Sequence, residues 1–172
     1  MYHRIYDSNN LNKLELFKSH IRFLSENYPI VLPGDALLPD KLSICLTFDD
    51  AYFDFYYYIF PLLKEFNIKA VLGVPAKYIV DNTAIDQDIR LNVPHHEAMQ
   101  DAVCFEKIPF CTWKEIREMA DSNLIEVASH SYSHANLIEK GIDFRQEVIM
   151  SKEIIEGKIS KKVDVFIYPY GK

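Results

Sequence analysis

The stretch LSICLTFDDAYFD, from Leu42 to Asp54, decides the fold and points to the chemistry. Apolar and polar residues alternate from Leu42 to Phe48, which is the pattern of a half-buried strand. Two adjacent carboxylates, Asp49 and Asp50, follow this strand directly. Because like charges side by side repel each other, the pair indicates either the start of a helix or a site that needs carboxylates.

Strands and helices alternate along the rest of the chain, which predicts a single α/β domain over residues 1–172 with a mainly parallel sheet. Pro61 predicts a kink or a fresh helix start inside one of the helices. Residues 75–110 are irregular and are predicted to form a long loop region. The expected helices are 11–27, 55–66, 112–122 and 144–159, and the expected strands after the first are 68–74, 124–129 and 163–168.

The composition excludes several classes of protein. The chain has 172 residues and a formal net charge of -6, and no basic stripe indicates a nucleic-acid partner. The N-terminus has no apolar signal segment and no apolar run reaches about 18 residues, so we expect no membrane span. As written, the sequence predicts a cytoplasmic protein; a missing N-terminal segment would make it secreted or part of the cell envelope. Cys45 is predicted to be a small buried hydrophobe.

Polar clusters follow three of the predicted strands: Asp49-Asp50, HSYSH at residues 130–134, and YPYG at residues 168–171. The carboxyl ends of parallel strands meet at one edge of a sheet, so these clusters are expected to lie together. Alone, two histidines at i and i+4 are more often a surface or capping pair. With one carboxylate they make a three-ligand metal site with an open position for water, and a second carboxylate can take that water's proton.

The chain resembles the polysaccharide deacetylases of the NodB homology type, carbohydrate esterase family four. TFDD matches the first motif of that family, HSYSH matches the second, and FIYPYG resembles the third. The resemblance extends from YHRI near the start to YPYG near the end. It implies a distorted (β/α) barrel of seven or eight units, of which this chain has five or six predicted strands. We therefore expect a barrel that is incomplete at its C-terminal end.

The resemblance also implies a role for each motif residue. Asp49 would be the general base, and Asp50, His130 and His134 would bind a divalent metal, with zinc as the expected ion. The main-chain N–H of Tyr170, beside Pro169, would stabilise the oxyanion at the substrate.

The chain departs from the family pattern at several positions. Ile167 stands where many members have an arginine, and Ala51 stands where a glycine usually follows TFDD. The family's C-terminal histidine, which protonates the leaving amine, has no counterpart here. His3, His95 and His96 are the histidines that could approach the site instead.

These features support three alternative functions. The first is a metal-dependent hydrolase that removes N-acetyl groups from an amino-sugar polymer such as N-acetylglucosamine polysaccharide, impaired by the missing histidine. The second is a non-catalytic remnant that binds carbohydrate. The third is an amidohydrolase acting on a small non-sugar amide. An incomplete barrel would also leave an open edge, so self-association or a completing partner is expected.

Overall fold

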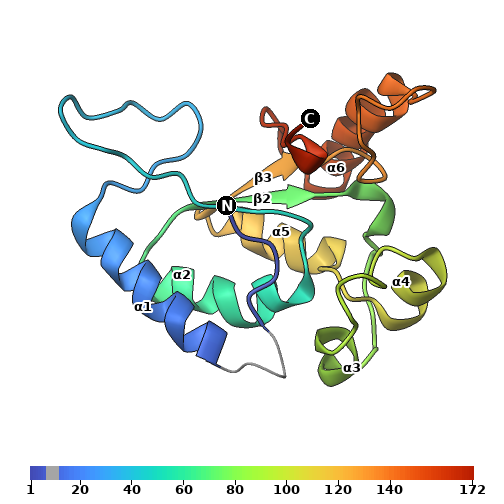
Figure 1. Cartoon of the computed structure of the whole chain (residues 1–172), viewed down its shortest axis with the longest axis horizontal. Helices are drawn as coiled ribbons and strands as arrows, with labels where there is room; N and C mark the ends of the chain where they lie inside the picture. The colour runs from blue at the N-terminus through green and yellow to red at the C-terminus, as the bar shows by residue number, and fades with distance from the viewer. Residues whose placement is uncertain (7–11) are drawn as a thin grey trace.

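A parallel sheet lies at the centre of the fold, with helices around it (Figure 1). The computed structural model describes residues 1–6 and 12–172. The sheet has the order β1-β2-β3, and both of its strand pairs are parallel. The predicted α/β class with a parallel sheet is therefore confirmed. The strands are β1 (Thr47–Phe48), β2 (Ala70–Val74) and β3 (Ile125–Ser129).

Two further segments extend the sheet by one bridge each. Tyr2 pairs in parallel with Phe48, and Phe166 pairs in parallel with Ser129. The predicted strand at 163–168 is thus reduced to a single bridge. Within the described ranges the strands form an open sheet, and no closed barrel is present.

The predicted strand at 42–48 is wrong over most of its length, because only its last two residues belong to β1. Ile44 instead forms an isolated parallel bridge with Ile30, and its N–H donates to the carbonyl of Pro29 at 2.9 Å. The segment around Ile44 therefore pairs with the segment around Ile30, which follows the first helix. Only after this bridge does the chain enter the sheet as β1. Cys45 is exposed as a result, which corrects the prediction that it is buried.

The predicted helices are confirmed, with changes at their ends. Pro61 lies in the first turn of a helix, as its position in the sequence indicates. Leu11, the first residue of the first predicted helix, lies outside the described residues. The helices are α1 (Asn12–Asn27), the π-helical turn η1 (Phe55–Ile59) continued by α2 (Phe60–Glu65), α5 (Trp113–Asp121), and the π-helical η3 (Arg145–Met150) continued by α6 (Ser151–Ile159).

The region 75–110 is more ordered than its sequence indicates. It contains the 3₁₀ turn η2 (Ala76–Tyr78) and two short helices, α3 (Gln87–Leu91) and α4 (Asp101–Lys107). Asp86 caps α3 by accepting the N–H of Asp88 at 2.8 Å. Helices of one or two turns carry too little periodicity to be recognised in the sequence.

A largely buried ion pair ties this region to α5. Arg90 makes two hydrogen bonds to the carboxylate of Glu115, at 2.8 and 2.9 Å, and its guanidinium lies 3.4 Å from the ring centroid of Phe53. It also donates to the carbonyls of Ile108 and Phe110. Glu115 is fixed in turn, because it forms the predicted capping box with Thr112 at the start of α5.

The same ordered region supports the turn after β1. The N–H of Cys111 donates to the carbonyl of Ala51 at 2.8 Å, and the N–H of Phe53 donates to the carbonyl of Pro109 at 2.8 Å. The turn that carries Asp49 and Asp50 is therefore held by backbone hydrogen bonds to the segment that Arg90 anchors.

We predict that Arg90→Met lowers the free energy of unfolding by about 3–5 kcal/mol, because it leaves a largely buried carboxylate and two carbonyls without their donor. Urea denaturation followed by circular dichroism measures this loss. Arg145→Met, at an exposed position, is the control and should leave stability nearly unchanged. Equal stabilities of the two variants would contradict a structural role for Arg90.

Candidate metal centre

The polar residues that follow the strands meet at the carboxyl edge of the sheet. Asp49 and Asp50 follow β1 directly, and His130 follows β3. β2 lies between these strands and pairs with both, so it brings their ends together. Asp49, Asp50 and His130 are each at most 3% exposed. Buried ionisable groups at one strand edge are the expected setting for a metal site.

The structure brings Asp50, His130 and His134 together. Asp50 Oδ1 lies 3.5 Å from His130 Nε2 and 3.3 Å from His134 Nε2. The ligand atoms of the three all lie within 4.8 Å of one another. Ligands placed about 2.1 Å from a tetrahedral ion are about 3.4 Å apart, so the two distances from Asp50 Oδ1 fit one small cation.

The hydrogen bonds around the cluster also fit a cation. His130 Nδ1 lies 2.9 Å from the carbonyl oxygen of Ile167, and because a carbonyl can only accept, Nδ1 carries the proton. This tautomer leaves a lone pair on Nε2, on the side of Asp50. His130 Nε2 and Asp50 Oδ1 are both buried without a hydrogen-bond partner. A bound cation would satisfy both atoms.

Electrostatics favour the metal-binding protonation states of Asp50 and His134. At His130 burial would lower the pKa, but the contacts with Asp50 and with the Ile167 carbonyl outweigh it and raise that pKa, so a cation would compete with a proton there. Burial alone would raise the pKa of Asp50, but the neighbouring imidazoles of His130 and His134 outweigh it and hold that pKa below its usual value. Burial lowers the pKa of His134. Near neutral pH the cluster therefore offers an ionised carboxylate and a neutral imidazole at His134.

The backbone around the cluster is strained. Asp50 and Ala51 have φ angles of 70° and 53°, in the left-handed region that favours glycine. Each such residue costs about 1–2 kcal/mol when it carries a side chain. Ala51 thus occupies a position where the glycine of the family motif would be unstrained. Ser131, His134 and Tyr170 also have positive φ, of 63°, 57° and 58°.

Asp49 lies beside the metal ligands and faces His3. Burial raises the pKa of Asp49. His3 Nε2 lies 3.9 Å from Asp49 Oδ2, and the His3 side chain is 43% exposed. Three further histidines, His3, His95 and His96, could approach the site according to the sequence. His3 lies next to Asp49, the predicted base.

Asp54 holds the N-terminal segment in this place. Its Oδ2 accepts the N–H groups of Ile5 and Tyr6, both at 2.8 Å. Since Tyr2 is bridged to β1, the segment is fixed on both sides of His3. Sequence reasoning missed this role of Asp54, although Asp54 ends the stretch that carries the first motif.

The other predicted site residues are placed as follows. The ring of Tyr170 lies edge-on to that of His134, with centroids 4.9 Å apart, and Pro169 is buried in the 3₁₀ turn η4 (Pro169–Gly171). His95 packs against Tyr52, with ring centroids 5.3 Å apart. His96 is 80% exposed and lies near Glu97, outside the metal cluster.

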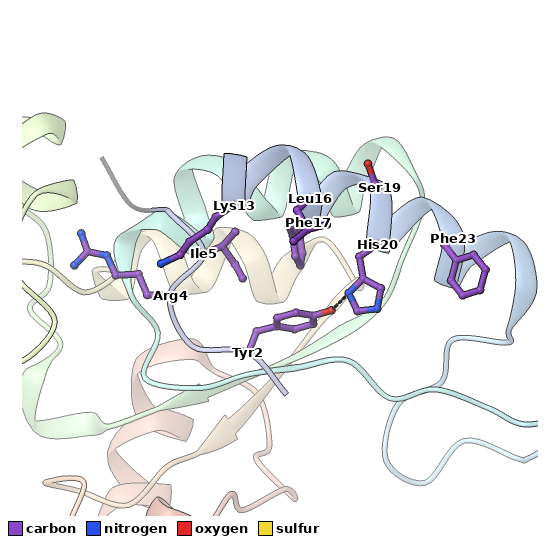
Figure 2. A pocket seen from close by; sticks show the side chains of 9 residues that line it. All are labelled: Tyr2, Arg4, Ile5, Lys13, Leu16, Phe17, Ser19, His20 and Phe23. Atoms are coloured by element: carbon purple, nitrogen blue, oxygen red, sulfur yellow. Dashed lines mark hydrogen bonds between the residues drawn. The ribbon is translucent and has the colours of Figure 1, made fainter. Parts of the chain in front are cut away.

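A cavity of about 510 Å³ lies apart from this cluster, between the N-terminal segment and α1 (Figure 2). Most of its lining is apolar, and none of the three predicted metal ligands contributes to it. The cavity is therefore not the candidate metal centre. Its lining residues are Tyr2, Arg4, Ile5, Lys13, Leu16, Phe17, Ser19, His20 and Phe23.

The candidate metal-binding residues lie within a region that matches a known protein family. The model of the polysaccharide deacetylase family matches residues 38–172, which include all three candidate metal ligands and Asp49. The chain belongs to the polysaccharide deacetylase family. The resemblance that its motifs show is thereby confirmed.

Two curated relatives illustrate the range of the family. The poly-beta-1,6-N-acetyl-D-glucosamine N-deacetylase of Escherichia coli O157:H7 is 27% identical over 167 residues, covering 81% of this chain and 23% of the relative. YxkH of Bacillus subtilis (strain 168) is 27% identical over 185 residues, covering 100% of this chain and 56% of YxkH. The chain thus spans about a quarter of the first relative and just over half of the second.

The fold agrees with the family assignment. A polysaccharide deacetylase from Bacillus cereus superposes with a TM-score of 0.74 at 24% identity, covering 100% of this chain and 50% of that structure. This chain therefore shares the fold of that structure. Among the described residues, no helix is both long and apolar enough to cross a bilayer.

We predict that the purified protein holds about one divalent cation per chain and that His130→Ala loses it, since two of the three protein ligands are too few for a stable site. Elemental analysis after dialysis measures the bound metal. His96→Ala, at an exposed position outside the cluster, should keep the metal and serves as the control. Equal metal content in His130→Ala and in the unmutated protein would contradict the assignment of the ligands.

Proposed function

We propose that this polysaccharide deacetylase is a metal-dependent hydrolase that removes N-acetyl groups from an amino-sugar polymer such as N-acetylglucosamine polysaccharide. The observation that carries the proposal is the buried cluster of Asp50, His130 and His134 with Asp49 beside it. The name of the Escherichia coli relative, which specifies poly-beta-1,6-N-acetyl-D-glucosamine, supports the same class of substrate.

Asp50, His130 and His134 would hold the cation, which when bound polarises the amide carbonyl and acidifies a water molecule. Two imidazoles and one carboxylate suit zinc, and the donor set also accepts other divalent ions. Asp49 would take the proton of the attacking water, and its raised pKa brings it closer to the range in which a carboxylate is an effective base. The main-chain N–H of Tyr170, whose ring packs on His134, would donate to the developing oxyanion.

The leaving amine needs a proton, and His3 is placed to supply it. Its imidazole lies on the Asp49 side of the cluster and is partly exposed, so a substrate could reach it. The bridge at Tyr2 and the carboxylate of Asp54 hold it there. We propose His3 as the general acid. On this basis the chain carries both proton-transfer groups of the reaction.

We predict that Asp49→Asn lowers the kcat for acetate release from N-acetylglucosamine oligomers by about 10²–10⁴, because an amide cannot take the proton of the water. Its metal content should equal that of the unmutated enzyme, since Asp49 is not among the three ligands. Asp164→Asn, at an exposed carboxylate, is the control. Turnover that survives in Asp49→Asn would rule out this residue as the base.

His3→Gln should also lower kcat by about 10²–10⁴ while leaving the metal content unchanged, because it removes the proton donor and keeps a polar side chain of similar size. An assay of acetate release with purified oligomers measures the change, and His96→Gln is the matched control. An unchanged kcat would show that another group protonates the amine. Metal and oligomer binding without turnover in the unmutated protein would instead favour a non-catalytic carbohydrate-binding function.

A further inference from the structure

The loop between the two histidine ligands is held by the turn that follows β2. Three consecutive carbonyls of residues 131–133 accept hydrogen bonds from three consecutive residues of η2. Two of the donors are backbone N–H groups and the third is a tyrosine hydroxyl. The pairs are Ala76 N to Ser131 O at 3.3 Å, Lys77 N to Tyr132 O at 2.8 Å, and Tyr78 Oη to Ser133 O at 3.2 Å.

Glu147 holds the same loop from the opposite side. Its Oε2 accepts the N–H of Ser133 at 2.9 Å, and its Oε1 accepts the Ser133 hydroxyl at 2.7 Å. Glu147 is only 5% exposed, so both of these bonds are shielded from water. The carbonyl of Ser133 accepts the hydrogen bond from the Tyr78 hydroxyl. All three polar groups of Ser133, its N–H, hydroxyl and C=O, are therefore hydrogen-bonded to other segments.

The helix that carries Glu147 is itself fixed to the sheet. η3 continues directly into α6, whose first residue is Ser151. The Ser151 hydroxyl is hydrogen-bonded to that of Ser129 at 2.9 Å, and both side chains are buried. Ser129 directly precedes His130. The carboxylate of Glu147 is therefore held in a defined position relative to the metal ligands.

The loop needs this support because its backbone is strained. Ser131 and His134 have positive φ, and such residues with side chains cost about 1–3 kcal/mol each unless their surroundings hold them. Ser133 directly precedes His134, so the bonds at Ser133 fix the peptide from which the second imidazole extends. Without them the loop could relax and move His134 away from Asp50.

We propose that Glu147 and Tyr78 are positioning residues that preorganise His134 for the metal, and that Glu147 in particular sets the metal affinity of the site. The proposal rests on the metal-dependent function proposed above. Residues that orient metal ligands through hydrogen bonds typically change metal affinity by about 10- to 100-fold when they are removed. Neither residue is a metal ligand, since neither belongs to the cluster of ligand atoms.

The test measures Zn²⁺ and Co²⁺ affinity directly, by competition with a chromogenic chelator, in the unmutated chain and in variants. Glu147→Ala should weaken both affinities by about 10- to 100-fold and alter the visible absorption of bound Co²⁺. Glu147→Gln should retain most of the affinity, because its amide can accept from the Ser133 N–H and donate to the Ser133 hydroxyl. Glu153→Ala, exposed and further along the same helix, is the matched control.

Tyr78→Phe and Ser133→Ala keep the proposal testable if Glu147→Ala does not fold. Each removes one hydroxyl from the network, and each should weaken metal affinity by less than Glu147→Ala does. Affinities and Co²⁺ spectra that stay unchanged in folded Tyr78→Phe and Ser133→Ala, or in folded Glu147→Ala, overturn the proposal. An unmutated chain that binds no metal overturns it together with the proposed function. An unmutated chain that binds metal without hydrolysing oligomers overturns the hydrolase alone.

Discussion

β2 lies at the centre of the sheet and pairs in parallel with β1 and β3, with Val74 in register with Ser129. This pairing places the residues that follow β1 next to those that follow β3. The same edge also receives Tyr2 and Phe166 through single bridges, so segments from both ends of the described chain reach it. The candidate metal ligands, the neighbouring carboxylate and His3 lie close together because of this one topological constraint.

Short motifs at strand ends allowed much of the site to be predicted from the sequence. Asp50, His130 and His134 could be grouped because each follows a recognisable strand, and parallel order brings such ends together. Their protonation states and separations could not be predicted, because they depend on burial and on the carbonyl of Ile167. The lengths of the outer strands were also missed, since an alternating pattern does not reveal which segment a strand will pair with. Asp54 holds the N-terminal segment by accepting backbone N–H groups. Because every residue except proline has such a group, the sequence does not indicate which ones Asp54 will bind.

Ile167, which departs from the family pattern, contacts the candidate metal site through its main chain. No charged side chain is available at this position, but the Ile167 carbonyl fixes the tautomer of His130. The Ile167 side chain occupies the space over Gly73, where an added Cβ would lie 3.1 Å from Ile167 Cδ1. Gly73 is therefore a position of close approach, and a side chain there would require the Ile167 side chain to shift by a few tenths of an ångström. The third motif thus supports the metal ligand through its backbone and its packing rather than through charge.

The three candidate ligands come from two segments that are distant in the sequence, with Asp50 in one and both histidines in the other, and no single supersecondary unit contains the cluster. Contacts of this kind form late, because long loops must close before they are made. A cation that binds only the assembled cluster stabilises the folded state by mass action. Metal supply would then set the fraction of chains that is folded, and chains without metal would be more open to unfolding and proteolysis.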